Sequence, residues 1–356
     1  MQVFAKQGIR NKSFQRYNCN QCGHVWHNNP RDMIGRFDGK MINWIGYIYL
    51  RSFSLHSTVE IVRSFYEKDY LTKDSVLLHL EQLIDQLPDI SGITHLFKPT
   101  RSGYYAFDGT WFKINGANKV LMICFDVDSL DIVNYLIADD ENYLTYGKLI
   151  NLVNGAEPGI LTGAKGFYSD GELGLVKHLK EEYGYIPLQL CVFHKYSRSN
   201  QIIPFVRAKG IDIEIKRMVE KVLFAPTKDE AISSLDDLKR YAREHQQNDK
   251  LKKIVGVLKR NFHLLLTHFD NPDMSPYNNA LEGFNHIIKR KIRLMKGFKK
   301  ELNMERWLKF ILLDYRFHKI HASGFKNRNG KSPLELAKVN LPKYHNWLNL
   351  VRKKTG

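Results

Sequence analysis

The sequence predicts an α/β protein that is built around a mixed β-sheet and carries helical regions before and after it. Apolar runs of strand length occur between residues 104 and 192, and helical segments separate the later runs. The apolar residues follow a helical period before residue 88 and again after residue 194. With 356 residues, of which 43% are hydrophobic, the chain can bury a substantial core and form two or three domains.

Residues 1–38 are expected to form an N-terminal segment like a zinc knuckle, because they are rich in turn-forming residues and contain a Cys-x2-Cys pair. The candidate ligands are Cys19, Cys22, His24 and His27. A structural zinc ion normally takes four ligands, and a second cysteine pair is missing here. Three interpretations stay open: one of the histidines completes the site, another chain completes it, or no metal binds. The four cysteines of the chain are too scattered for a disulfide framework.

Residues 39–98 are predicted to form a helix-turn-helix-like DNA-binding domain. Apolar residues three and four positions apart predict three helices, at residues 41–51, 57–66 and 73–87. Ser57 and Thr72 are expected to be N-caps, and Pro88 should end the third helix. Three short helices suit a fold whose last helix enters a major groove. The alternative is a plain helical hairpin that packs on the next domain.

Residues 99–300 are expected to form the central α/β domain. Three strands come first, and a turn at Gly109 divides the first of them. Helices and strands then alternate. The predicted strands are residues 104–108 with 111–114, 120–126, 132–138, 166–170 and 186–192, and the predicted helices are 142–153 and 172–183. Helical connections make the later strands parallel, so this order predicts a mixed sheet of the ribonuclease H kind.

The remainder of the chain is predicted to be helical. A helical insertion spans about residues 197–275, and a helix follows at 278–295. Residues 301–356 are expected to form a basic helical C-terminal region. Ser332 as N-cap, with proline at the first helical position, starts its last short helix.

The charge of the chain favours nucleic acid as a partner. The 54 Lys and Arg residues outnumber 37 Asp and Glu, which gives a net charge of +17. Residues 283–356 hold 19 of these cations against four acids, so that nearly all of the excess lies there. No apolar stretch approaches the ~20 residues of a membrane span, and the N-terminus does not resemble a secretion signal. A cytoplasmic protein is expected, associated with the nucleoid, or a nuclear one if the source is eukaryotic.

Two aspartates end predicted strands, and a third acid lies on a later helix. Asp108 and Asp170 are each followed by glycine, and adjacent strands would bring their carboxylates together. Like charges so close repel unless a cation such as Mg²⁺ or Mn²⁺ lies between them. On the helix at 278–295, a buried apolar stripe leaves Glu282 on a polar face beside a row of cations. Taken alone, that helix is better explained as a solvated surface helix in which a glutamate pairs with a lysine.

Four other aspartates, Asp126, Asp128, Asp131 and Asp139, also end or follow predicted strands. They are expected to be turn formers, and Asp126 is the substitute to consider if Asp108 is dispensable.

Four blocks carry a family resemblance in the same order along the chain. FDGTWFK around Asp108, YSDGELGL around Asp170, LCVFHK at residues 190–195 and NNALEGFNHIIKRKIR around Glu282 resemble the signature blocks of DDE transposases. The similarity is to the Mutator-like group and related prokaryotic insertion-sequence transposases. It implies a ribonuclease H-like core in which Asp108, Asp170 and Glu282 bind two Mg²⁺ or Mn²⁺ ions. It also implies a homodimer or higher oligomer on DNA.

The resemblance assigns further roles to residues of this chain. Cys191 and His194 match the C(2)H block, and are expected to order the core or the DNA near the metals; the alternative is a buried cysteine beside a histidine that bonds the backbone. The expected DNA contacts are His286, Lys289, Arg290, Arg293 and Lys296. The expected activity is metal-dependent cleavage at terminal inverted repeats and strand transfer to target DNA. The alternatives are a catalytically silent or domesticated DNA-binding regulator and a host ribonuclease H-like nuclease.

Overall fold

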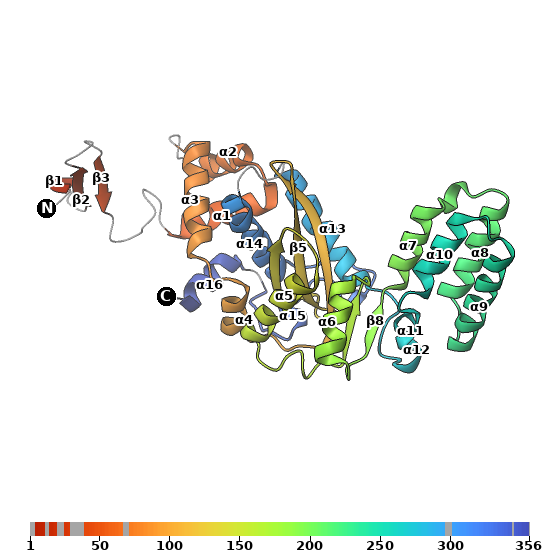
Figure 1. Cartoon of the computed structure of the whole chain (residues 1–356). Coiled ribbons are helices and arrows are strands. Elements are labelled where there is room, and N and C mark those ends of the chain that lie inside the picture. The colour runs from red at the N-terminus through yellow and green to blue at the C-terminus, as the bar shows by residue number, and fades with distance from the viewer. Residues whose placement is uncertain are drawn as a thin grey trace. The chain divides into compact units, whose positions relative to one another are not determined.

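The computed structural model of the chain is shown in Figure 1. It describes residues 4–10, 14–19, 25–28, 39–66, 71–295, 301–343 and 345–355, the first three ranges by their backbone alone. By its internal contacts the chain divides into two compact units. The first comprises Met1–Asp89, Leu302–Asp314 and Leu341–Gly356, and the second comprises Ile90–Glu301 and Tyr315–Asn340.

The N-terminal segment contains three short antiparallel strands in the order β1-β2-β3. These are β1 (Phe4–Arg10), β2 (Phe14–Cys19) and β3 (Val25–Asn28). The turn-rich composition did not predict them, because backbone pairing between neighbouring segments tolerates many side chains. The candidate zinc ligands Cys22 and His24 lie outside the described residues, as do the side chains of Cys19 and His27. Zinc binding there stays a prediction.

The three helices predicted near the N-terminus are confirmed. They are α1 (Gly39–Ser52), α2 (Leu55–Tyr66) and α3 (Lys73–Gln86). Thr72 caps α3 as predicted, since its hydroxyl accepts from the backbone N of Ser75. The expectation that Ser57 caps α2 is wrong, because the helix begins two residues earlier and Ser54 Oγ accepts from the Ser57 backbone N at 3.2 Å.

C-terminal residues complete this first unit. They come from α14 (Glu301–Phe317) and α16 (Trp347–Thr355). Asp314 is buried and accepts hydrogen bonds from the guanidinium of Arg51 at 2.9 and 3.0 Å and from Trp347 Nε1 at 3.0 Å. Residues 302–314 and 341–356 therefore group with the N-terminal helices, whereas the sequence suggested a separate C-terminal region.

The charge of α3 does not favour contact with phosphates. Its single cation, Lys73, is outnumbered by Asp74, Glu81 and Asp85. Arg306 forms a two-pronged ion pair with Asp85, at 2.7 and 2.8 Å. A helix with more acids than cations is repelled by the backbone of a major groove. The three predicted helices are present, but the charge of α3 does not support the prediction that this helix enters the major groove of DNA.

The second unit is built on a five-stranded mixed sheet in the order β6-β5-β4-β7-β8. Its strands are β4 (Tyr104–Ile114), β5 (Ala117–Asp126), β6 (Asp131–Ala138), β7 (Gly166–Ser169) and β8 (Leu188–Leu190). The first three pair antiparallel, and β7 and β8 join parallel to β4. The predicted meander with later parallel strands is confirmed, although β8 is shorter than expected.

The turn predicted at Gly109 is wrong, because β4 continues through this residue and pairs with β5 along its whole length. Glycine is required there for another reason. A Cβ at this position would lie 2.0 Å from Glu141 Oε1 and 2.9 Å from a methyl group of Val120. Gly109 thus lets the Glu141 carboxylate approach the strand closely.

Helices cover both faces of the sheet. On one face lie α5 (Tyr143–Ala156) and α6 (Leu173–Tyr183), which share a core with Tyr105 and Phe107 of β4. On the other face lies α13 (Asn279–Leu294), whose Phe284 ring is 5.3 Å from that of Phe125. Because successive side chains of a strand point to opposite faces, Asp108 projects towards α13.

The predicted helical insertion follows β8. Its helices are α7 (Val192–Ile202), η1 (Phe205–Arg207), α8 (Ile211–Leu223), α9 (Lys228–Glu244), α10 (Asp249–Lys259), α11 (Phe262–Leu265) and α12 (Thr267–Asp270). Lys195 of α7 is buried and donates to the carbonyl oxygens of Val257 and Arg260, both at 3.1 Å. It fastens α7 to the C-terminal end of α10. Burial and the neighbouring cations Arg198 and Arg260 lower its pKa to about 8.

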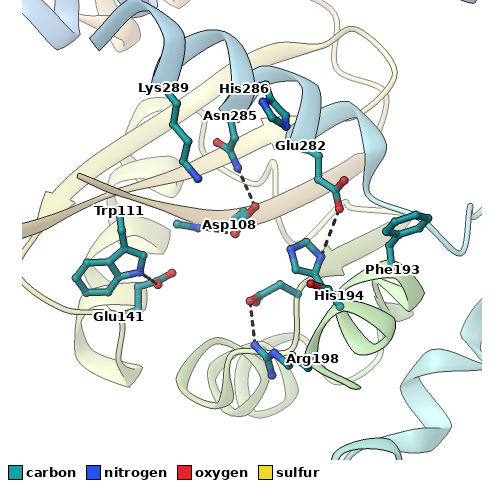
Figure 2. A pocket seen from close by; sticks show the side chains of 13 residues that line it. Asp108, Trp111, Glu141, Phe193, His194, Arg198, Glu282, Asn285, His286 and Lys289 are labelled. Carbon is teal, nitrogen blue, oxygen red and sulfur yellow. Dashed lines mark hydrogen bonds and ion pairs between the residues drawn. The ribbon is translucent and has the colours of Figure 1, made fainter. Parts of the chain in front are cut away.

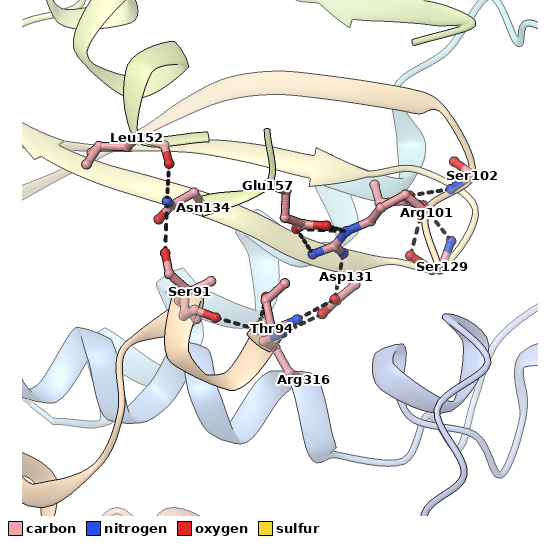
Figure 3. Close-up of polar contacts among 12 residues, drawn as sticks. Ser91, Thr94, Arg101, Ser102, Ser129, Asp131, Asn134, Leu152, Glu157 and Arg316 are labelled. Carbon is pink, nitrogen blue, oxygen red and sulfur yellow. Dashed lines mark hydrogen bonds and ion pairs between the residues drawn. The ribbon is translucent and has the colours of Figure 1, made fainter. Parts of the chain in front are cut away.

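A buried ion-pair network closes the end of the sheet where β6 begins (Figure 3). Asp131 accepts from Arg101 Nη1 at 2.8 Å and from two nitrogens of Arg316 at 2.7 Å each. Arg316 also donates to Thr94 of α4 (Ile90–Phe97) at 3.1 Å. Burial alone would raise the pKa of Asp131, but the two guanidinium groups hold it below its usual value. Asp131 is therefore a structural anchor, whereas the sequence suggested a turn former.

The remaining elements of this unit are η2 (Lys326–Arg328) and α15 (Pro333–Leu336). The predicted start of α15 is confirmed, since Ser332 caps it and forms a reciprocal capping box with Glu335. Among the described helices of both units, none combines the length and hydropathy that a membrane crossing requires.

Candidate active site

A cleft of about 540 Å³ lies between the end of β7, the first turns of α7 and α13, and the middle of β4 (Figure 2). It is lined by Asp108, Gly109, Trp111, Glu141, Asp170, Phe193, His194, Ser197, Arg198, Glu282, Asn285, His286 and Lys289. All three predicted catalytic acids line it. Residues from separate segments of the chain thus meet in one hollow.

Strand register places the two aspartates side by side. The parallel pairing of β4 with β7 ends at Phe107 opposite Ser169. The next residues are Asp108 and Asp170, which therefore lie at neighbouring positions. Asp170 follows β7 as predicted, but the prediction that Asp108 ends a strand is wrong, because β4 continues to Ile114 and Asp108 pairs with Ile123 of β5.

Asp108 is held by the helix that faces the sheet. Its Oδ1 accepts from the backbone N of Gly109, and its Oδ2 accepts from Asn285 Nδ2, both at 2.8 Å. Burial, and secondly the negative charge of Asp170, raise the pKa of Asp108 to about 8. The crowding of acids here disfavours the charged carboxylate in the absence of a cation.

Asp170 has partners of its own. Its Oδ1 accepts from the backbone N of Glu172 at 3.0 Å, at the start of α6. Its Oδ2 lies 3.2 Å from Arg198 Nη2, an ion pair that is partly open to solvent. The sequence analysis did not single out Arg198. It lies seven residues beyond Cys191 on α7, a spacing of two helical turns that could have placed it near the same end of the sheet.

Glu282, in the first turn of α13, faces the C(2)H residues more closely than it faces the aspartates. Its Oε1 is 3.5 Å from His194 Nδ1 and 3.8 Å from Cys191 Sγ. The donor atoms of these three residues all lie within 4.8 Å of one another. The carboxylates of Asp108, Asp170 and Glu282 all line the cleft. Among the described residues, however, their oxygens do not all lie within 4.8 Å of one another.

The environment of Cys191 is buried but rich in backbone donors. Burial raises the pKa of its thiol, while the backbone N–H groups of Asn278, His194 and Phe193 oppose that rise. The residue precedes the first turn of α7, where helix N–H groups favour a negative charge. Among the described residues, the buried Nδ1 of His194 has no hydrogen-bond partner, and it lies 3.5 Å from Glu282 Oε1.

A fourth acid, Glu141, was missed by the sequence analysis. It accepts from Trp111 Nε1 at 2.7 Å and from the Tyr146 hydroxyl at 2.9 Å. Burial raises the pKa of its carboxyl. The glycine at position 109 was the signal, since a glycine within a strand often marks a close approach by another group.

The cations predicted on α13 divide into two sets. His286 and Lys289 line the cleft, but Arg290 and Arg293 are exposed and do not. Lys296 lies outside the described residues. The apolar stripe on which this prediction depended is confirmed, since the structure buries Leu281, Phe284, Ile288 and Ile292.

Asp126 is no substitute for Asp108. It is fully buried outside the cleft and accepts from the backbone N of Ser102 at 2.7 Å and from the hydroxyl of Ser129 at 2.8 Å. The bond from Ser129 fixes the turn between β5 and β6, and the bond from Ser102 joins that turn to the segment before β4. The structure therefore agrees with its interpretation as a turn former.

Comparison with known proteins agrees with this geometry. The family model described as "Transposase, Mutator family" matches residues 100–320, more than half of the chain. No curated protein is similar enough to be matched. The matched region contains the whole sheet, the helical insertion and every residue that lines the cleft. The chain therefore belongs to the Mutator family of transposases.

Proposed function

We propose that this transposase cuts and joins DNA by metal-dependent phosphodiester chemistry at the cleft, with Asp108, Asp170 and Glu282 as its catalytic acids. The observation that carries the proposal is their convergence. Asp108 lies within β4, Asp170 follows the neighbouring parallel strand β7, and Glu282 comes from the helix that packs on the sheet. Family membership supports DNA as the substrate.

The donor set fits hard divalent cations such as Mg²⁺ or Mn²⁺. Carboxylate oxygens are the ligands that these ions prefer. Burial, and secondly the charge of Asp170, raise the pKa of Asp108, so a divalent cation bound there would stabilise its carboxylate. When bound, two such ions would supply charge stabilisation to the attacking and leaving oxygens of an in-line displacement.

The chain's own residues would orient the acids and the DNA. Asn285 holds Asp108 in a fixed direction, and Arg198 holds Asp170. When Asp170 binds a metal ion instead of Arg198, the Arg198 guanidinium would bind a phosphate oxygen of the DNA at the same cleft. His286 and Lys289 add positive charge along the helix that carries Glu282. Arg290 and Arg293 on the same helix, with Lys296 after it, extend the predicted path of the DNA.

The sheet supports a ribonuclease H-like core. A meander of three antiparallel strands, two further parallel strands on the side of the first strand, and a helix on the opposite face are the features expected of that fold. The helical insertion lies between β8 and the helix that carries the last acid. We further propose that the first unit, through helices other than the acidic α3, and the basic C-terminal residues hold the terminal inverted repeats, in a dimer or larger oligomer.

The test is cleavage and strand transfer by the full chain on labelled DNA that carries the ends of the element. Reactions contain Mg²⁺ or Mn²⁺ and compare the wild type with Asp170→Asn and Glu282→Gln. We expect both changes to abolish product while DNA binding is kept. Asp128→Asn, a carboxylate of the same unit outside the cleft, is the matched control and should retain activity.

Other outcomes would point to other functions. DNA binding without metal-dependent cutting by the wild type would support the regulator. Hydrolysis without joining would support a ribonuclease H-like nuclease. Unchanged activity of either acidic variant would remove that residue from the proposed site.

A further inference from the structure

The carboxylate of Glu282 belongs to a second cluster, which consists of one thiol, one imidazole and one carboxylate. Cys191 contributes the thiol and His194 the imidazole, both from the start of α7. The three donor atoms lie within 4.8 Å of one another. Because α7 follows β8 directly and α13 begins beside it, with the backbone N of Val192 bonded to the Pro276 carbonyl at 3.0 Å, the cluster is held by rigid backbone.

The spacing of these donors is that of a small tetrahedral metal site. With zinc bonds of about 2.3 Å to sulfur and about 2.0–2.2 Å to nitrogen and oxygen, the sulfur–oxygen edge would be about 3.6 Å and the nitrogen–oxygen edge about 3.4 Å. The corresponding distances here are 3.8 Å from Cys191 Sγ and 3.5 Å from His194 Nδ1 to Glu282 Oε1. An ion could therefore enter with small side-chain adjustments.

The chemistry of the donors selects the kind of ion. Thiolate and imidazole prefer zinc and similar softer ions, whereas Mg²⁺ binds oxygen ligands almost exclusively. His194 Nδ1 is buried without a hydrogen-bond partner among the described residues and lies 3.5 Å from Glu282 Oε1, so that the neutral tautomer with its proton on Nε2 presents a lone pair to the cluster. Three protein ligands leave one tetrahedral position for water or a phosphate oxygen, as in open zinc sites.

We propose that Cys191, His194 and Glu282 form a zinc site at the edge of the catalytic cleft. On binding, the S–H bond of Cys191 breaks, its proton leaves to solvent, and a sulfur–zinc bond forms. The same Glu282 oxygen then bonds zinc and is withdrawn from the aspartates. Zinc at this site inhibits DNA cleavage by competing for Glu282; this last step alone rests on the proposed function.

The site is tested by titrating the full metal-free chain with Co²⁺, which takes zinc sites and gives a thiolate-to-cobalt absorption band. The chain for this test carries Cys19→Ser and Cys22→Ser, so that the N-terminal thiols cannot contribute. We expect one equivalent of Co²⁺ to produce the band, and stoichiometric Zn²⁺ to remove it.

Three further variants in that background decide the ligands. Cys191→Ser should lose the band, and His194→Gln should weaken Co²⁺ binding at least tenfold while keeping the fold, because its side chain is partly exposed. Cys124→Ala is the matched control and should keep the band, since this buried cysteine lies in β5 outside the cluster. Circular dichroism checks that each variant is folded.

Two results would overturn the proposal. One is a chain that gives no thiolate band once Cys19 and Cys22 are replaced. The other is a folded His194→Gln variant that binds Co²⁺ as tightly as its parent. Both results are read without DNA, so they are independent of whether the chain cleaves DNA. In an active chain, micromolar Zn²⁺ should inhibit Mg²⁺-dependent cleavage, and excess chelator should restore it.

Discussion

Replacing Asp108 with asparagine should stabilise the metal-free chain while abolishing catalysis. Burial and the charge of Asp170 raise the pKa of Asp108 to about 8, against 3.8 for an ordinary aspartate. At pH 7 the Asp108 carboxyl is ionised in the unfolded chain but mostly protonated in the folded chain. Because pH 7 lies about 3 pKa units above the unfolded value, taking up this proton costs about 4 kcal/mol of folding free energy as an upper limit. Because the cleft admits solvent, we expect a gain of about 1–2 kcal/mol in the free energy of unfolding.

The local geometry allows this exchange. Asparagine is isosteric with aspartate, and its Oδ1 can still accept from the backbone N of Gly109. Its amide nitrogen would face Asn285 Nδ2, the present donor to Asp108. A 180° rotation of the Asn285 amide turns an acceptor towards it and restores the hydrogen bond. The substitution is therefore expected to remove charge without leaving a cavity.

The pH dependence gives the sharper test. Because the folded-state pKa of Asp108 is above the unfolded value, the wild type has its full free energy of unfolding below about pH 4 and loses part of it as the pH rises towards 8. Asp108→Asn has no carboxyl to ionise at this position. The difference in free energy of unfolding between the variant and the wild type should therefore grow between about pH 5 and about pH 8. The assay is urea unfolding with a chelator present, followed by circular dichroism.

The control for this test is Asp170→Asn, which breaks the ion pair with Arg198 and should not stabilise the chain. Addition of Mn²⁺ should stabilise the wild type and remove the advantage of Asp108→Asn. The reasoning is refuted if that variant is no more stable than the wild type at about pH 8, or if its advantage is the same at both pH values.

Three further substitutions test the frame around the cleft. Arg316→Met removes one of the two cations that pair with buried Asp131 and should cost about 3 kcal/mol in urea unfolding; a loss below about 1 kcal/mol would contradict the anchor role. Gly109→Ala places a Cβ 2.0 Å from Glu141 Oε1 and therefore displaces the Glu141 carboxylate. We expect DNA cleavage to fall at least tenfold. Full activity would show that the position of Glu141 has no influence on the site. Lys195→Met leaves two carbonyl groups at the end of α10 without a donor and should cost about 1–3 kcal/mol in the free energy of unfolding. Amide hydrogen exchange should become faster in α10 before it does so in the sheet. Equally faster exchange in both would contradict the role of Lys195 in holding α10.

Local patterns in the sequence were sufficient to predict most elements and three acids that line the cleft, but not Glu141 or Arg198. Strand and helix periods predicted the succession of strands and helices along the chain, because side-chain alternation and helical spacing are local properties. Caps such as Thr72 and Ser332 were confirmed because they depend on a few neighbouring residues. Asp108 and Asp170 were predicted to lie together at the ends of two adjacent strands; they do lie at neighbouring positions, but only Asp170 follows its strand, because β4 continues past Asp108.

Contacts between distant segments were decided only by the tertiary structure. Glu282 meets Cys191 across 91 residues, and Asn285 meets Asp108 across 177, so no local pattern contains either contact. Asp131 looked like a turn residue until the fold enclosed it between two arginines. The C-terminal helices likewise joined the N-terminal ones through burial of shared apolar surface. Sequence periodicity shows which face of an element is buried; packing alone decides what that face is buried against.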